Sequence, residues 1–159
     1  MEDACTIVYD SAVDEFTEDC LFQKVRGKPN VAIVATTTDG DVFGGFYSVA
    51  AMEQNYSYFD RTIFVFLFES HGRCETPQRF TVKRKWKEGA QVVFLKDDYY
   101  GGRFVHLGSG SGLSLGNEKS RAWCEGLFRG FEGIKDTTLS GEEFPQKFTC
   151  CRLVAIQLE

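Results

Sequence analysis

Two residues near the middle of the chain have types and a spacing that suit catalysis. His71 and Cys74 lie three positions apart in the segment SHGRCETPQ. An imidazole close to a thiol can accept its proton and leave a nucleophilic thiolate. Glu69 precedes them and supplies a carboxylate for acid–base work. Cys74, His71 and Glu69 are therefore the candidate residues for a hydrolase-type or a thiol-based, peroxide-scavenging activity.

The surrounding residues favour a non-catalytic protein over such an enzyme. Arg73 and Glu75 place charges of both signs beside Cys74, so the local charge does not favour a thiolate. A structural zinc site usually needs four ligands, and the only other histidine is His106. We expect His106 to be a half-exposed strand residue on the opposite face from its two neighbours. We expect neither a metal nor a cofactor, and an enzyme remains the alternative.

Two further stretches could carry chemistry. If Cys150 and Cys151 lie in a strand, one thiol faces the core and the other faces outward. The outward thiol and Cys74 could be oxidised in place of other cellular targets, which is a sacrificial form of thiol chemistry. The glycine-rich segment 108–116 lacks the Gly-Lys-Ser/Thr of a phosphate-binding loop. We expect that segment to be a turn between strands.

Length and composition indicate one folded domain spanning residues 1–159. Of the 159 residues, 43% are hydrophobic and 15 are Phe, which is ample for a packed core. The net charge of −5 argues against nucleic-acid binding, which needs a basic face. No apolar run approaches the roughly 20 residues that span a bilayer, and the acidic N-terminal segment does not resemble a secretion signal. We expect an intracellular, cytoplasmic protein without membrane insertion.

The segment from Val31 to Val49 predicts a β-hairpin around which the fold is organised. A β-branched, apolar run meets the turn Thr37–Gly40, and a second apolar run follows. The pair Asp39-Gly40 is a strong hairpin signal because both residues tolerate positive φ. Gly44 and Gly45 inside the return strand indicate that another backbone or side chain packs closely against it.

The remaining pattern predicts many short strands and one clear helix. Apolar spacings of three and four predict a helix over 13–25, and the polar segment 52–61 predicts a loop. The apolar run Ile63–Phe68 predicts a strand buried on both faces. Further strands are expected at 6–9, 80–86, 91–95, 103–107, 114–116 and 148–158. We expect a mainly β (α+β) fold, a two-layer antiparallel β-sandwich with an N-terminal helix and short peripheral helices.

The order of these motifs resembles that of TLDc domains over nearly the whole chain. The resemblance is carried by the residues Asp39, Gly40, Phe43, Gly44, Gly45, Ser48, Gly101 and Gly102. It implies a bare TLDc domain that protects eukaryotic cells against oxidative stress. The family commonly has Glu where this chain has Arg103, and the acidic residues expected after Leu107 are absent. Acidic contacts at that edge are therefore in question.

A TLDc-like protein without an assembled catalytic set is expected to act by binding. The resemblance implies a protein partner, the vacuolar proton-pumping ATPase, and a role in regulating it. Aromatic side chains dominate protein interfaces. We therefore expect contacts from the aromatic residues of two predicted loops, namely Tyr56, Tyr58, Phe59, Tyr99 and Tyr100. The oligomeric state stays open.

Overall fold

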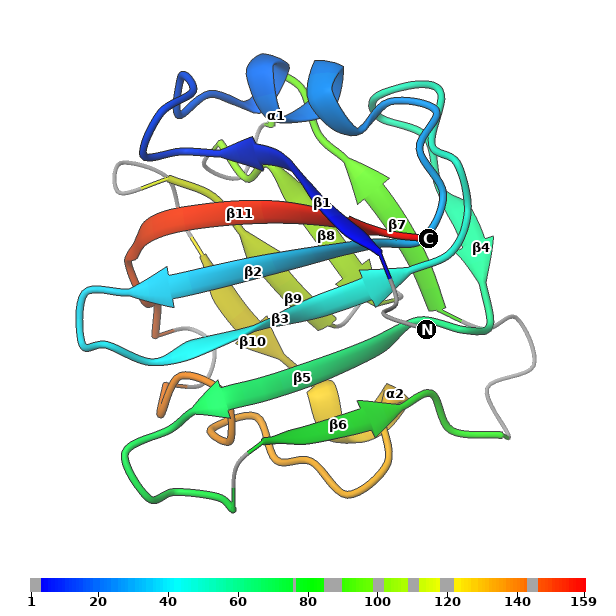
Figure 1. The fold of residues 1–159 in the computed structure, drawn as a ribbon. Helices are drawn as coiled ribbons and strands as arrows, with labels where there is room; N and C mark the ends of the chain where they lie inside the picture. Colours follow the sequence, from blue (N-terminus) through cyan, green and yellow to red (C-terminus); the bar gives the residue numbers. More distant parts are fainter. Residues whose placement is uncertain are drawn as a thin grey trace.

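Two antiparallel β-sheets make up most of the structure, a computed structural model that describes residues 4–75, 77–84, 90–98, 102–108, 112–117, 122–142 and 146–159 (Figure 1). The six-stranded sheet has the spatial order β1 (Cys5–Asp10), β11 (Cys150–Leu158), β2 (Val31–Thr37), β3 (Val42–Tyr47), β5 (Phe64–Glu69) and β6 (Gln78–Thr81). The five-stranded sheet has the order β10 (Trp123–Glu125), β9 (Gly112–Leu115), β8 (Val105–Gly108), β7 (Ala90–Phe94) and β4 (Tyr58–Asp60).

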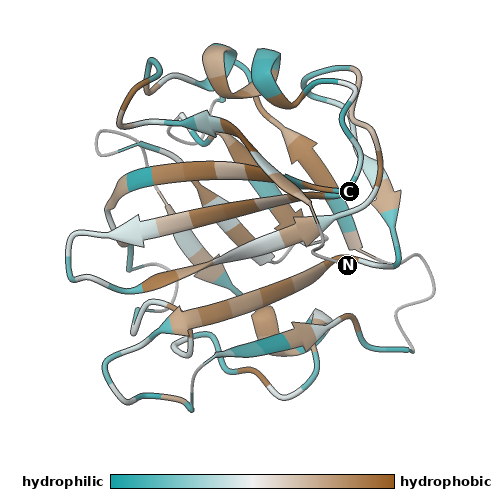
Figure 2. Cartoon of the chain, in the orientation of Figure 1, coloured by the Kyte–Doolittle hydropathy of each residue, from teal (hydrophilic) through white to brown (hydrophobic). Residues whose placement is uncertain are grey.

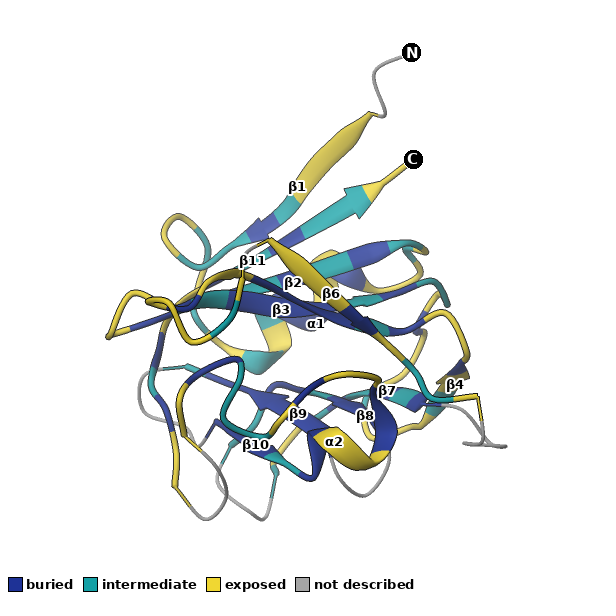
Figure 3. Cartoon of the chain, turned by 90° about the horizontal axis from the view of Figure 1, so that it is seen from below, coloured by how far each residue is buried: buried dark blue, intermediate teal, exposed yellow. Residues whose placement is uncertain are grey.

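The two sheets pack face to face around one buried cluster (Figure 3). Side chains from β3 meet the opposite layer, where Tyr47 contacts Phe94 of β7 edge-on with ring centroids 5.7 Å apart. Phe43 contacts Phe148 in the same way at 5.2 Å. Burial of such aromatic and aliphatic side chains is the main force that holds two layers together. The expectation of a mainly β fold with two antiparallel sheets is confirmed.

The predicted central hairpin is present as β2 and β3. The turn closes with a bond from the Gly40 N–H to the Thr37 carbonyl, and Gly40 has φ +86°. The two glycines lie on opposite faces of the six-stranded sheet. A Cβ on Gly45 would lie 2.5 Å from Leu107 Cδ1 of the other sheet, and one on Gly44 would lie 1.8 Å from the Ile33 carbonyl oxygen. The close approach expected from paired glycines is therefore confirmed.

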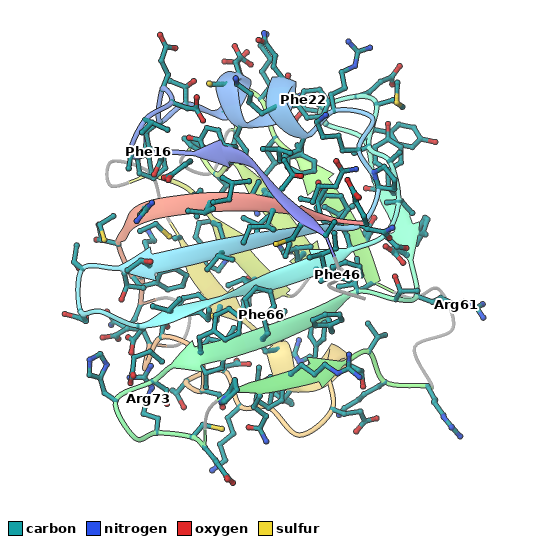
Figure 4. The ribbon with its side chains drawn as sticks, viewed as in Figure 1. Phe16, Phe22, Phe46, Arg61, Phe66 and Arg73 are labelled. Carbon is teal, nitrogen blue, oxygen red and sulfur yellow. The ribbon has the colours of Figure 1, made fainter. Side chains whose placement is uncertain are left out.

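The N-terminal helix is shorter than predicted. The helix α1 runs from Glu18 to Val25, whereas a helix over 13–25 was expected. Thr17 is the N-cap, and its hydroxyl accepts a bond from the Cys20 N–H. The preceding residues form turns instead, because the Asp10 carboxylate and carbonyl accept the nearby N–H groups, and Val13 is 83% exposed. Phe22 anchors α1 by packing on Phe94 (Figure 4).

Other expected elements are present with shifted ends. The predicted loop 52–61 contains the short strand β4, which pairs with β7. Only part of the predicted strand 80–86 is present, because β6 ends at Thr81 and residues 85–89 lie outside the described residues. The predicted strand 114–116 is the longer β9, and a short helix α2 (Leu127–Gly130) follows β10. Gly108 and Gly112 flank a connection whose residues 109–111 lie outside the described residues.

The apolar strand β5 differs from the prediction in one important respect. Its inward side chains, Val65 and Leu67, are fully buried between the sheets. Its outward side chains alternate with them, and Phe68 is 51% exposed while Phe64 is half-buried. The prediction that this strand is buried on both faces is therefore correct for its middle, where the outward Phe66 is also buried, and wrong for its ends, because none of the described residues covers the outer face there.

Candidate functional site

The structure does not bring the predicted catalytic residues together. The Cys74 thiol donates to Gln78 Oε1 at 2.7 Å, and not to His71. The His71 ring contacts a buried carboxylate of the β2–β3 turn, where its Nδ1 lies 2.8 Å from Asp41 Oδ1. Glu69 accepts a bond from the His71 backbone N–H. The backbone of His71 has φ +54°, in the left-handed region, and its side chain contacts the hairpin turn.

Sequence reasoning missed two members of this polar cluster, Asp41 and Arg73. The Arg73 guanidinium lies 2.9 Å from Asp41 Oδ1 and also donates to the Leu139 carbonyl at 2.8 Å (Figure 4). Asp41 is thus a buried carboxylate with two cationic or hydrogen-bonding partners. Such an arrangement compensates the burial of a charge. No pattern in the sequence signals it, because Asp41 is 30 positions from His71.

This cluster fastens three segments of the chain to one another. His71 and Arg73 come from the β5–β6 connection, Asp41 from the hairpin turn, and Leu139 from the turns after α2. In the part of the chain that the structure describes, no hydroxyl or thiol is hydrogen-bonded to the His71 ring. A nucleophilic mechanism needs that contact. The geometry therefore assigns the cluster a structural role.

Two of the residues that carry the resemblance to TLDc domains, Phe43 and Ser48, have internal contacts in this protein. Phe43 lies in the core, and Ser48 donates to the carboxylate of Asp60. Asp60 also accepts from the Thr62 N–H at 2.8 Å and from the Thr62 hydroxyl at 2.7 Å. Burial raises the pKa of Asp60, but the hydrogen bonds from Thr62 and Ser48 outweigh burial and hold that pKa below its usual value. This carboxylate joins the end of β3 to β4.

Arg103 stands where TLDc domains commonly have Glu, and its side chain also has contacts within the chain. Its Nε and Nη2 atoms donate to the two carboxylate oxygens of Asp98 at 2.8 and 3.0 Å. Its guanidinium lies 4.9 Å from the centroid of the Trp123 ring. Gly102 precedes it with φ +75°, and Gly101 lies outside the described residues. Arg103 therefore supplies the charge that pairs with Asp98, and the contact is internal to the chain.

The predicted aromatic contacts are partly exposed. Tyr56 is 56% exposed and Phe59 is 58% exposed, which suits contact residues. The Tyr58 hydroxyl instead accepts bonds from the N–H groups of Met52 and Glu53, so Tyr58 organises its own loop. Tyr99 and Tyr100 lie outside the described residues.

A groove on the outer face of the six-stranded sheet is the most distinctive surface feature. It has a volume of about 440 Å³, and all its described lining residues except Gln78 and Arg79 are apolar. We call it the aromatic groove. It is lined by Ala32 and Val34 of β2, by Phe46, Phe64, Phe66 and Phe68 of β3 and β5, by Pro77, and by Ile156 and Leu158 of β11. Figure 2 shows the hydrophobic residues of these strands, and Figure 4 places Phe46 and Phe66 on this sheet.

The register of the strands explains why a groove forms. Opposite residues of neighbouring strands share a face, and Ile156 pairs with Ala32, which pairs with Phe46. Small residues of β2 thus lie between large residues of β11 and the phenylalanines of β3 and β5. Phe66 pairs with Gly44, and a Cβ on Gly44 would lie 2.9 Å from the Phe66 ring. The absence of that Cβ lets the ring lie against the sheet.

The phenylalanines of the groove form a continuous set of ring contacts. Phe46 and Phe64 are stacked with centroids 4.9 Å apart, and Phe66 contacts Phe64 at 6.3 Å and Phe68 at 4.9 Å. The Arg79 guanidinium lies 5.4 Å from the Phe64 ring centroid. Ring contacts of this kind restrict the side chains that line the groove.

Three other properties of the described residues bear on the site. No group of three or more His, Cys, Asp or Glu residues among them is arranged to hold a metal ion. Neither of the helices found there has the length and apolar character needed to cross a membrane.

Cys150 is buried and Cys151 is exposed, as expected for adjacent strand residues, and burial raises the pKa of the Cys150 thiol to about 12.

Comparison of the sequence with protein-family models gives no match, and comparison with curated protein sequences finds no relative. The geometry of the chain itself therefore carries the functional argument.

Proposed function

We propose that this chain is a non-catalytic interaction module of the TLDc type, and that it binds a protein partner through the aromatic groove. The observation that carries the proposal is the row of phenylalanines on the outer face of the six-stranded sheet, where Phe68 is exposed and Phe46 and Phe64 are half-buried. Folded proteins rarely leave a continuous apolar surface in water unless a partner covers it. Aromatic side chains in such a concave surface are typical interface anchors.

The resemblance to TLDc domains supplies the cellular part of the proposal. It implies a cytoplasmic role in protection against oxidative stress, and a partner in the vacuolar proton-pumping ATPase. The support is the order of the motifs along the chain, from the hairpin to the final strand. The enzymatic alternatives have less support, because the side chains of His71 and Cys74 contact different residues.

Affinity capture from the source cells tests this proposal. Tagged wild-type protein is compared with Phe68→Asp, which places a charge in the groove, and with Phe128→Asp. Phe128 is a matched control because it is 49% exposed, against 51% for Phe68, and does not line the groove. We expect the wild type and Phe128→Asp to enrich vacuolar ATPase subunits, and Phe68→Asp to lose them. Equal enrichment by both variants would refute binding through the groove.

A further inference from the structure

The aromatic groove has a shape and a charge that specify its occupant more narrowly than a generic protein partner. We infer that it binds an amphipathic α-helix of a partner protein, with an apolar stripe on the phenylalanines and an acidic residue on Arg79. This inference rests on the proposed function, because it names the partner element that occupies the same site.

The width of the groove suits a helix. Its walls are on β5 and β11, and two strands, β2 and β3, lie between them. Three strand spacings of about 4.8 Å separate the backbones of β5 and β11 by about 14 Å. An α-helix with its side chains is about 10–12 Å across. Ala32 and Val34 on β2 have small side chains and form the floor, whereas Phe46 of β3 and the Phe66 ring over Gly44 belong to the aromatic wall.

The length of the groove suits a short amphipathic segment. The wall formed by Phe64, Phe66 and Phe68 extends along β5 over four residue spacings, which is about 13 Å. A helix covers that distance in about nine residues, or two to three turns. Side chains at positions i, i+3 or i+4, and i+7 of such a helix would meet the ring contacts of the groove.

The charge of the groove selects an acidic helix. Arg79 is the charged residue among its described lining residues, and it makes no ion pair with any residue that the structure describes. Lys83 and Arg84 follow along the same chain segment. A carboxylate beside the apolar stripe of the partner would pair with Arg79. Such complementarity sets the orientation and the association rate more than the affinity itself.

Other occupants fit these features less well. A second copy of this chain would present the same concave surface, so the two groove floors would stay apart. A membrane surface is flat or gently curved, and it would not reach the floor at Ala32 and Val34.

The test uses three fluorescent peptides of equal length in anisotropy titrations with the purified chain. The first has leucines at helical spacing flanked by glutamates, the second replaces the glutamates by lysines, and the third scrambles the leucines of the first. We expect the acidic amphipathic peptide to bind about tenfold or more tightly than either of the others. Arg79→Glu should reverse the preference between the first two peptides, and Phe68→Asp should weaken both. Phe128→Asp should change neither.

Several results would overturn the helix inference. The inference fails if the wild-type protein binds the acidic and the basic peptide equally. It also fails if Arg79→Glu leaves the preference for the acidic peptide unchanged. A groove-dependent dimer in gel filtration would make a second copy the occupant, and groove-dependent binding to anionic lipid vesicles would make it a membrane. If no peptide binds while Phe68→Asp still abolishes cellular capture, the proposed function stands and the helix inference fails. If the peptides bind as expected but the Phe68→Asp variant still captures vacuolar ATPase subunits from cells as the wild type does, the helix inference stands and the proposed function fails. Thermal unfolding confirms that each variant is folded.

Discussion

Buried carboxylates, rather than the predicted nucleophile, organise the polar side chains of this protein. His71 and Cys74 are close in sequence, but the conformation of the turn separates their side chains. Asp41 contacts His71 and Arg73 of the β5–β6 connection, and Asp60 accepts hydrogen bonds from Ser48 and Thr62. The sequence pattern located the loop but not the pairing, because a spacing of three in a turn does not fix side-chain direction.

The hydrogen bonds of Asp60 predict a pH-dependent stability. Because its pKa is lower in the folded chain than the unfolded value of about 4, Asp60 stabilises the fold above that pH. This contribution is lost as the pH falls through the folded pKa. We expect Asp60→Asn to cost about 2 kcal/mol at neutral pH and clearly less at pH 3. Chemical denaturation at both pH values measures it. Asp39→Asn, in the exposed turn, is the control, and a cost for Asp60→Asn that grows in acid would contradict the prediction.

The cysteines predict a clear order of reactivity. Cys5 and Cys151 are exposed, whereas Cys124 and Cys150 are buried and burial raises the pKa of both thiols. A thiol must ionise to react, and a buried thiol does so at a large cost. We expect iodoacetamide to modify Cys5 and Cys151 in the folded protein. Cys124 and Cys150 should react only after denaturation, as followed by peptide mass spectrometry. Early modification of Cys150 would show that the closing strand opens readily.

Gly44 and Gly45 of the central hairpin leave space for different neighbours, the Phe66 ring and the Leu107 side chain. The sequence predicted this hairpin correctly, because Asp39-Gly40 and the flanking apolar runs are local signals. The strand β4 was missed, because a three-residue strand inside a polar segment has no periodicity to detect. The start of α1 was misplaced, because Val13 fits the helical spacing but is exposed in a turn.

The packing of the two sheets predicts an energetic coupling between Gly45 and Leu107. A methyl group on Gly45 would overlap Leu107 Cδ1, so we expect Gly45→Ala to cost about 1–3 kcal/mol. Leu107→Val removes part of the overlap, and the double variant should cost about 1 kcal/mol less than the sum of the single changes. Urea denaturation of the four proteins gives this coupling. Gly44→Ala is the control, because its overlap is with the Ile33 carbonyl and Leu107→Val should not relieve it. A strictly additive Gly45 cycle would contradict the packing.

The molecule as a whole is a two-layer body with one outer face uncovered. The apolar run of β5 predicted a buried strand, because composition does not distinguish burial by a second layer from burial by a partner. Only the topology shows that Val65 and Leu67 face the other sheet while Phe64 and Phe68 face outward. The groove depends on residues from β2, β3, β5 and β11, which are far apart in the sequence, so no local pattern could have revealed it.

Site-specific photocrosslinking in the source cells tests binding through the groove most directly. A photoreactive phenylalanine analogue is placed at position 68, in the groove, or at position 128, on α2, which are similarly exposed. We predict that position 68 crosslinks to a vacuolar ATPase subunit and that position 128 does not. Crosslinking of that subunit from position 128 alone, or from neither position while the complex is captured intact, would contradict the account.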